Sequence, residues 1–380
     1  MTNATRIGTI DFWRGAVLIA ILVDHIPGNM LESLTPRNFG LSDSSEAFVF
    51  LSGLSVGIVY LPRAQKHGLP AVARGCFQRA LKLYGVHIAL TAAALVVFAC
   101  AWRLSGVDDL IAAHGRSFVF ETPAQGLAGL ALLSHQLGYF NILPLYVVLM
   151  LWAPAALALA MRGPSLALAA SAGVYGTSRT LGLDLPSWPE AGGWFFNPLA
   201  WQLVFTIGLV SAMVWRRRAP RATPSLIALS TVVIASAALV TTSVAGAAPG
   251  FRDAASSHLD LAKHDLGLAR LAHFAALAYL VAAAPGFQRL ASGAAGRAVQ
   301  SLGRNGLAVF AAGSLLSAVG QAALGAAAPH TSVGVEQMAG LAYTLAGIAT
   351  LFALARWIEC RNAPAPPRSA ASPAAAPQPL

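Results

Sequence analysis

Charged side chains are scarce in this sequence, and their scarcity decides the class of protein. Asp, Glu, Lys and Arg make up 11% of the 380 residues, whereas soluble domains carry roughly 25%. Hydrophobic residues make up 56% of the chain, and the mean hydropathy is +0.63. Such a chain needs lipid around it, because side chains that face lipid require no polar coat. The composition predicts an all-α, polytopic integral membrane protein and excludes a soluble globular domain.

Cysteine is nearly absent, and no basic arm accompanies the net charge of +10. Cys76, Cys100 and Cys360 match no metal or redox spacing, and their odd number gives no disulfide framework. The basic residues lie in short segments between apolar runs, which argues against nucleic acid as a partner. No Ala-x-Ala site follows the first apolar run, so we expect no cleavable signal. We also expect no metal and no permanently bound cofactor.

Apolar runs of membrane-spanning length occur about ten times along the chain. A span needs about 20 residues, and Gly126–Leu137 is too short to cross, so we expect it to be re-entrant. The first and fifth runs are the weakest candidates. The predicted spans are Ile10–Ile26, Glu46–Pro62, Leu81–Arg103, Asn141–Met161, Ser165–Leu181, Leu199–Trp215, Ser225–Ala245, Leu266–Pro285, Asn305–Leu324 and Met338–Trp357.

The charges between these runs predict the orientation. Cytoplasmic loops of membrane proteins carry an excess of Lys and Arg. With the N-terminus inside, 17 of the 25 basic residues fall on the inner side, and only Asp11 and Glu359 among the 15 acidic residues do so. We therefore predict N-in and C-in with an even number of spans. The inner basic residues are Arg6, Arg63, Lys66, Arg74, Arg79, Lys82, Arg162, Arg216, Arg217, Arg218, Arg221, Arg289, Arg297, Arg304, Arg356, Arg361 and Arg368.

The chain divides into one membrane domain and a short tail. Residues 1–361 form the membrane domain, and no internal repeat divides it. Residues 362–380 are rich in Pro, Ala and Ser and have no apolar pattern. Such a segment cannot bury a core, so we expect a disordered cytoplasmic tail.

The first span carries ionisable residues where a lipid-facing helix would have none. Arg14 and His25 are eleven residues apart, which is three turns plus roughly 20° at about 100° per residue. Asp11, Arg14 and His25 therefore share one helical face. The alternative is that Arg14 pairs with Asp11 and extends to the inner headgroups, while His25 lies in the outer interface. Asp24 weakens this alternative, because it places a second titratable group at the depth of His25.

The segment after the first span brings two more carboxylates to the level of His25. Asp43 and Glu46 precede an apolar run, and this spacing predicts an N-cap with a glutamate at the third helical position. That role does not exclude a second one at His25. Gly53 and Gly57 form a small-xxx-small spacing, which predicts a packing face for another helix.

These residues resemble the OpgC family, within the acyltransferase-3 superfamily of membrane acyltransferases. The resemblance rests on IDFWRGAVLIAILVDHIPGN (10–29), with its Arg-x10-His pattern, and on NFGLSDSSEAFVFLSGLSVGIVY (38–60). Glu46 stands where most of the superfamily has Asp. A basic motif at the third span is matched loosely by RGCFQRALKLY (74–84). NILPLYVVL (141–149), WFFNPLAWQ (194–202), LAKHDLGLARLAHF (261–274) and GRNGLAVF (303–310) extend the resemblance over about residues 8–357.

The resemblance implies an inner-membrane O-acyltransferase with a cytoplasmic donor. The implied donor is an acyl-CoA, succinyl-CoA or acetyl-CoA, and the implied acceptor is a hydroxyl of a periplasmic glucan. We expect His25 to be the general base, with Asp24 or Glu46 holding its tautomer. We expect Arg14 to stabilise negative charge on the thioester oxyanion or on the donor's phosphates.

Further residues are expected to bind the two substrates. Arg79 and Lys82 are candidates for the donor's phosphates, although a positive inner face explains such residues equally well. Lys263 or Arg270 is a candidate for a succinyl carboxylate. Aromatic rings of the segment 187–202 could stack on sugars or form an interfacial belt. The remaining substrate-binding candidates are Asp43, Asn141, Tyr146, Asn197, Trp201, Gln202 and Asp265.

Two other functions fit the same composition. Buried charges and glycine-interrupted helices also mark transporters, although no pair of broken helices recurs in two halves of the chain. A non-catalytic subunit of a glycan export assembly is the second rival. The expected partners are the lipid bilayer, acyl-CoA and the glycan, and the sequence leaves open a homo-oligomer or a complex with glucan-synthesis proteins.

Overall fold

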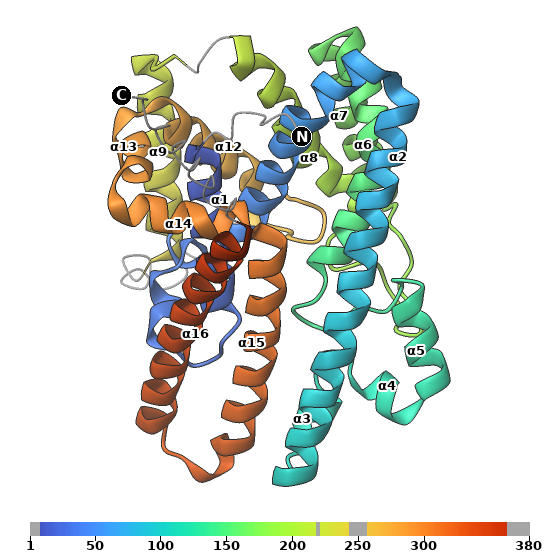
Figure 1. Ribbon diagram of the computed structural model, residues 1–380, viewed down its shortest axis with the longest axis vertical. Coiled ribbons are helices and arrows are strands. Elements are labelled where there is room, and N and C mark those ends of the chain that lie inside the picture. The colour runs from blue at the N-terminus through green and yellow to red at the C-terminus, as the bar shows by residue number, and fades with distance from the viewer. Residues whose placement is uncertain (1–7, 218–220, 243–256, 363–380) are drawn as a thin grey trace, which may run out of the picture.

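In a computed structural model of the chain, residues 8–217, 221–242 and 257–362 are described, and almost all of their regular structure is helical (Figure 1). The isolated bridge between Pro186 and Gly193 is the one β pairing in these ranges. An all-helical fold follows from the apolar runs, because a helix satisfies its backbone hydrogen bonds within the segment. The predicted all-α fold is confirmed.

Ten helical segments coincide with the ten predicted spans. Two of them belong to one element, α2, and shorter helices fill the connections. The elements are α1 (Gly8–Asp24), η1 (Met30–Leu34), η2 (Pro36–Asn38), α2 (Ser44–Ser105), α3 (Asp109–Ala112), α4 (Ser117–Glu121), α5 (Pro123–Ala131), α6 (Ile142–Arg162), α7 (Pro164–Leu181), α8 (Pro198–Arg217), α9 (Pro224–Thr241), α12 (Leu268–Ala283), α13 (Pro285–Ser292), α14 (Ala294–Arg304), α15 (Gly306–Ala327), η3 (Ala328–His330) and α16 (Val333–Asn362).

Helix α2 is a hairpin of two helices that turns at Gly68. Gly68 has φ +79° and ψ 167°, a conformation that glycine adopts readily because it lacks a Cβ. The Tyr60 hydroxyl donates to the Gly75 carbonyl at 3.3 Å. In a straight helix these residues would be about 22 Å apart, at about 1.5 Å per residue. The chain therefore doubles back, and α2 contains two of the predicted spans (Figure 1).

Six described helices are long and apolar enough to cross a membrane: α2, α6, α8, α9, α15 and α16. A seventh span forms if α12 and α13, bent by 68° at their junction, cross together. Since α2 doubles back, these helices account for eight of the ten predicted spans. Helix α1, with 17 residues, and α7 make up the other two and lie outside this set. The polytopic membrane fold is confirmed, and the total of ten spans stays a prediction.

The first and last described helices meet α14 at one side of the molecule. A Cβ on Gly8 would lie 3.0 Å from the Gln300 side chain, and Arg304 pairs with Glu359 at 2.7 Å. The start of α1 and the end of α16 therefore lie on the same side, as an even number of spans requires. The tail beyond residue 362 lies outside the described residues.

The first half of α2 packs tightly on α8 through its two glycines. A Cβ on Gly53 would lie 1.9 Å from the Phe205 carbonyl oxygen, and one on Gly57 would lie 2.6 Å from the Leu209 carbonyl oxygen. Small residues let helix backbones approach closely in membranes. The predicted packing face of Gly53 and Gly57 is confirmed.

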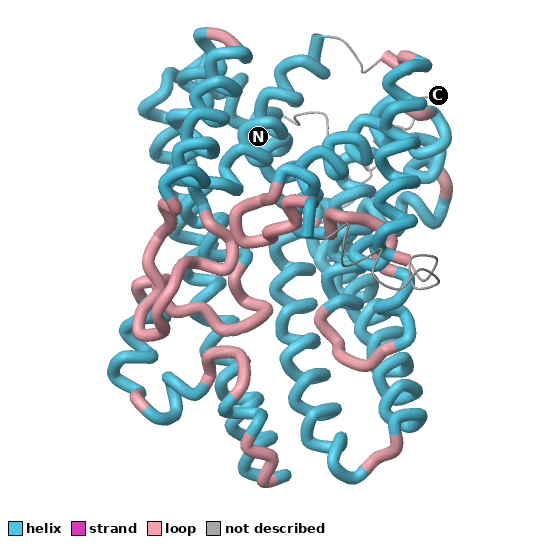
Figure 2. The backbone as a smooth tube through the Cα atoms, turned by 180° about the vertical axis from the view of Figure 1, so that it is seen from behind, coloured by secondary structure: helices cyan, strands magenta, loops and turns pink. Residues whose placement is uncertain are grey.

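Several long loops gather near the middle of the molecule's height (Figure 2). They connect α1 to α2, α5 to α6 and α7 to α8, and a further loop precedes α12. Non-helical backbone is tolerated at membrane depth only where protein buries it or where it lines a cavity. The loops therefore indicate the level at which a binding cavity is expected.

Candidate active site

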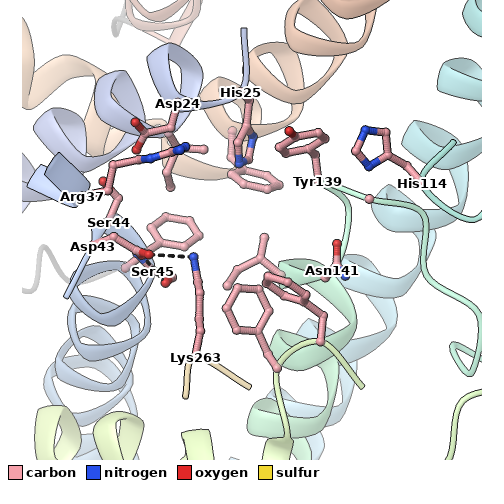
Figure 3. Close-up of a pocket in the computed structure, with 17 residues that line it drawn as sticks. Asp24, His25, Arg37, Asp43, Ser44, Ser45, His114, Tyr139, Asn141 and Lys263 are labelled. Carbon is pink, nitrogen blue, oxygen red and sulfur yellow. Dashed lines mark hydrogen bonds and ion pairs between the residues drawn. The ribbon is translucent and has the colours of Figure 1, made fainter. Parts of the chain in front are cut away.

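A cavity of about 550 Å³ lies where these loops meet the ends of α1, α2 and α6 (Figure 3). Its floor and walls include the rings of Phe48, Phe195, Phe196 and Phe310. A mostly apolar cavity with a few convergent polar groups is the usual form of a small-molecule site. The polar lining residues are Asp24, His25, Arg37, Asp43, Ser44, Ser45, His114, Tyr139, Asn141 and Lys263.

The imidazole of His25 faces this cavity without a hydrogen bond to any described residue. His25 follows the last residue of α1, and its backbone carbonyl accepts a hydrogen bond from Gln321 at 2.8 Å. Its ring centroid lies 4.8 Å from that of Tyr139, at an interplanar angle of 59°. Both ring nitrogens are therefore available to a ligand. This arrangement places the predicted general base at the wall of the cavity.

Neither predicted carboxylate partner of His25 forms a hydrogen bond or ion pair with its imidazole. Asp24 lines the cavity, but its buried Oδ1 has no hydrogen-bond partner in the described ranges. Glu46 is fully buried and pairs with Arg270 at 2.6 Å. The prediction that Glu46 holds the His25 tautomer is wrong, because the carboxylate is committed to Arg270 and to its own helix end.

The helix end in question is the N-terminus of α2, where the predicted cap forms in full. The backbone N–H of Ser45 donates to the Asp43 carboxylate at 2.8 Å. The backbone N–H of Asp43 donates to the Glu46 carboxylate at 2.9 Å. This reciprocal capping box satisfies two amides that a helix start leaves unpaired. The predicted N-cap role of Asp43 and Glu46 is confirmed.

Two cations from the α12 region neutralise these carboxylates. Lys263 Nζ lies 2.6 Å from Asp43 Oδ2, and Arg270 contacts both Asp43 at 3.1 Å and Glu46 at 2.6 Å. Burial alone would raise the pKa of the Asp43 carboxyl, but the charges of Lys263 and Arg270 outweigh burial and lower the pKa well below its ordinary value. The cluster fixes the start of α2 to the start of α12.

Of the two cations predicted to bind a succinyl carboxylate, Lys263 alone lines the cavity. Its Nζ also lies 5.7 Å and 5.6 Å from the ring centroids of Phe195 and Phe196. Arg270 lies behind the wall, with a side chain that is 11% exposed and bound to two carboxylates. Arg270 is therefore not positioned to contact a substrate.

Asn197 and Trp201 hold the loop that carries Lys263. The Trp201 indole N–H donates to the carbonyls of Lys263 at 3.1 Å and His264 at 3.0 Å. The Asn197 amide donates to the Asp265 carboxylate at 3.0 Å. Asn197 and Trp201 are buried, with exposures of 1% and 0%. The prediction that Asn197 and Trp201 bind substrate is wrong, because their polar groups are used inside the protein. Asp265 does not line the cavity, but its side chain is 33% exposed, and its role in binding substrate stays a prediction.

Gln202 is also structural. Its side chain accepts from the Ser171 hydroxyl and donates to the Ser171 carbonyl at 2.8 Å. It is 3% exposed and joins α8 to α7. A buried polar residue in a membrane bundle needs such a partner, so the substrate-binding prediction for Gln202 is also wrong.

One wall of the cavity comes from residues that the sequence did not single out. Tyr139 and His114 are non-glycine residues with φ of +71° and +59°, and their ring centroids lie 5.2 Å apart. The Gly138 N–H donates to the His114 carbonyl at 3.0 Å. Burial and the nearby Arg116 lower the pKa of His114, which favours the neutral imidazole. Left-handed backbone at such residues is uncommon and clusters at functional sites.

Arg37 is the second lining residue that sequence reasoning missed. It comes from the short helix η2 and pairs with Glu32 at 3.1 Å on a largely exposed surface. Turn and loop residues carry no periodicity, so their contacts cannot be deduced from spacing. For His114 and Tyr139 the sequence does hold one indication, a glycine directly beside each of them. Gly115 follows His114 and Gly138 precedes Tyr139, and such glycines are typical of tight backbone turns.

Arg14 lies outside the cavity, within the protein at the other end of α1. Its guanidinium donates to Asp11 at 3.1 Å, to the Gly303 carbonyl at 3.1 Å and to the Ser55 hydroxyl. Its side chain is 20% exposed. The pair with Asp11 agrees with the alternative given above, whereas the contacts to α14 and α2 hold the guanidinium against protein.

Two predicted donor-binding residues lie away from the cavity. Arg79 and Lys82 are exposed on the second half of α2, and neither lines the cavity. Asn141 and Asp43 do line it, and Tyr146 lies directly behind its wall. The described residues contain no group of three or more His, Cys, Asp or Glu side chains that could hold a metal ion.

The family model described as OpgC protein matches residues 6–363. The chain belongs to the OpgC family. No curated protein and no solved structure matches it significantly. The OpgC match includes the cavity, the charge cluster and Arg14. OpgC membership implies a transferase and suggests a membrane enzyme that modifies glucans by acylation.

Proposed function

We propose that this OpgC-family protein is an O-acyltransferase of the bacterial inner membrane. It moves an acyl group, succinyl in this proposal, from cytoplasmic acyl-CoA to a hydroxyl of a periplasmic glucan or related glycan. The observation that carries the proposal is the imidazole of His25, which faces the cavity and forms no hydrogen bond with a described residue. A base that the protein leaves unpaired at a cavity wall is available to a substrate proton.

The chemistry requires one base and one leaving thiolate. His25 takes the proton of a sugar hydroxyl as the hydroxyl oxygen attacks the thioester carbon. The carbon–sulfur bond then breaks, and the imidazolium returns the proton to the departing thiolate of coenzyme A. The products are the sugar ester and the free thiol, so no further reactant is needed.

The cavity also offers groups for the acceptor and for the acyl chain. The Asn141 amide has no hydrogen bond to its own helix end and points into the cavity (Figure 3). The rings of Tyr139 and Phe195, which are 38% and 50% exposed, offer apolar surface to a sugar face. Lys263 is the cation placed to attract the carboxylate of a succinyl group.

Arg14 is assigned to the donor's phosphates. It lies eleven residues from His25, or about 16 Å along the helix axis. Its bond to Asp11, one turn further from His25, leads the guanidinium away from the cavity. An oxyanion donor must lie about 3 Å from the reacting oxygen, so Arg14 is too far for that role. Arg79 and Lys82 add positive charge on the inner side for the same anion.

The test is transfer of labelled succinate from succinyl-CoA to a purified glycan by the purified protein. We expect His25→Ala and His25→Gln to abolish transfer while the midpoint of heat denaturation stays at the wild-type value. His330→Ala, at an exposed position, is the matched control and should transfer normally. Wild-type transfer by His25→Ala would refute the proposal.

The same assay separates the two rival functions. A transporter would move labelled solute into proteoliposomes without forming a new ester. A non-catalytic subunit would transfer no label unless glucan-synthesis proteins were added. Mass spectrometry of periplasmic glycans from wild-type and deletion strains would identify the acyl group and the acceptor.

A further inference from the structure

The hydroxyl of Tyr146 is buried without a hydrogen-bond partner in the described part of the chain. The residue is 6% exposed. Ser52 faces the hydroxyl, but the two do not reach hydrogen-bonding geometry. Most buried side-chain hydroxyls are paired, and an unpaired one destabilises the fold. Its retention therefore calls for a reason other than stability.

The ring of Tyr146 lies directly behind the cavity that holds His25. It packs edge-on against Phe48, with 5.3 Å between ring centroids. Phe48 in turn stacks on Phe310 at 5.6 Å, and both phenylalanine rings line the cavity. One ring thus separates the Tyr146 side chain from the cavity.

The hydroxyl belongs to a column that runs from the cavity to Arg14. On α2, Ser45 and Phe48 line the cavity, and Ser52 and Ser55 follow at spacings that keep all four on one helical face. Ser55 accepts from Arg14, and the charge of Arg14 also acts on Tyr146. Between Phe48 and Arg14 the column is therefore lined by polar side chains, and at Phe48 it is lined by an aromatic ring.

Two other helices present a face to the same column. On α1, His25 and Ile21 line the cavity, and Arg14 lies on the same face further along. On α15, Phe310 lines the cavity, and a Cβ on Gly306 would come within 3.1 Å of the Arg14 side chain. Ser52 and Ser55 are only half-buried.

We propose that the Tyr146 hydroxyl is a subsite for the acyl donor. It donates a hydrogen bond to a carbonyl oxygen, amide or thioester, of the arm that joins the acyl group to the donor's phosphates. The proposal rests on the proposed function, because that function places phosphates at Arg14 and the acyl group at His25. A carbonyl between those two points supplies the acceptor that the hydroxyl lacks in the protein itself.

The test is Tyr146→Phe, which removes the hydroxyl and keeps the ring against Phe48. We expect KM for succinyl-CoA to rise, or kcat/KM to fall, by roughly 10- to 100-fold. KM for the glycan should not change. The midpoint of heat denaturation should stay equal or rise, because the variant no longer buries an unpaired hydroxyl. This combination separates a binding role from a structural one.

Tyr343→Phe is the matched control. The Tyr343 hydroxyl donates to the Leu316 carbonyl at 2.7 Å, and Tyr343 does not line the cavity, so removal of the hydroxyl should lower the denaturation midpoint and leave transfer unchanged. Wild-type kinetics of Tyr146→Phe would overturn the subsite, and so would a lowered midpoint. If the wild-type protein transfers no label, the proposed function itself is wrong. If the wild type transfers label and Tyr146→Phe has the same kinetics, only the subsite is wrong.

Discussion

The guanidinium of Arg270 lies 2.6 Å from a carboxylate oxygen of Glu46, although 224 residues separate them in the chain. Glu46 is fully buried and Arg270 nearly so. The pair joins the first turn of α2 to α12 beside the cavity. It therefore fixes the wall on which Lys263 and Asp43 lie.

Arg270→Met should destabilise the protein strongly. The substitution leaves Glu46 buried without its cation, and breaking a buried pair in this way costs about 3–5 kcal/mol. Heat denaturation in detergent would measure the loss. Arg304→Met is the comparison, because its pair with Glu359 is partly exposed and contributes about 0–1 kcal/mol. Equal losses for the two variants would contradict this reading.

Acid should destabilise the protein through Asp43. A carboxyl with a lowered folded pKa stabilises the fold above its unfolded pKa, about 3.9, and this contribution is lost as pH falls toward the folded value. Lys263→Met should lessen the acid-dependent loss, because one of the two lowering charges is gone and the folded pKa of Asp43 then lies nearer the unfolded one. Denaturation midpoints followed from neutral pH to about pH 2 should drop less in the variant than in the wild type; an equal drop would argue against this role of Lys263.

Tyr139 should position the imidazole of His25 through its ring. Tyr139→Phe keeps that ring, so we expect nearly wild-type kcat. Tyr139→Gly removes the ring and suits the positive φ of this residue, so the fold should stay intact. We expect its kcat for acyl transfer to fall roughly 10- to 100-fold, with little change in KM for the donor. A Tyr139→Gly enzyme with normal kcat would rule out the positioning role.

The contact of α2 with α8 should tolerate no side chain at Gly53. Gly53→Ala places a Cβ against the Phe205 carbonyl, and overpacking of this kind costs about 1–3 kcal/mol. Gly85→Ala makes the same change on the same helix, where a Cβ would meet nothing within 4 Å. We expect Gly85→Ala to be neutral or stabilising by about 0.5–1 kcal/mol. The measurement is the denaturation midpoint of each variant, and a Gly53→Ala midpoint as high as that of Gly85→Ala would contradict the prediction.

The choice of acyl group should depend on Lys263. Lys263→Met removes the one lysine on the described cavity wall, so the preference for succinyl-CoA over acetyl-CoA should fall roughly tenfold. The ratio of kcat/KM for the two donors measures it. An unchanged ratio would show that the carboxylate of the acyl group is recognised elsewhere.

The sequence was sufficient for the helices because lipid imposes long apolar runs, and for the cap at Asp43 because that motif is local. Asp24 and Asp43 were correctly predicted to lie at the level of His25, and all three residues line the cavity. Asn197 and Trp201 were wrongly predicted to bind substrate, because the sequence does not distinguish a polar side chain that faces a ligand from one that bonds a group of the protein. Tyr139 and His114 were missed, because only tertiary folding brings their loops to α1.

Besides the ion pair of the Lys263 side chain with Asp43, the loop of Lys263 is held through its backbone, because Trp201 donates to the carbonyls of Lys263 and His264. Any residue placed at position 263 would accordingly start from the same Cα position at the cavity wall. A single substitution at this position can therefore change the charge that faces the acyl chain while the backbone of the loop stays in place. Relatives that handle other acyl groups would then differ at this position while keeping the tryptophan that supports it.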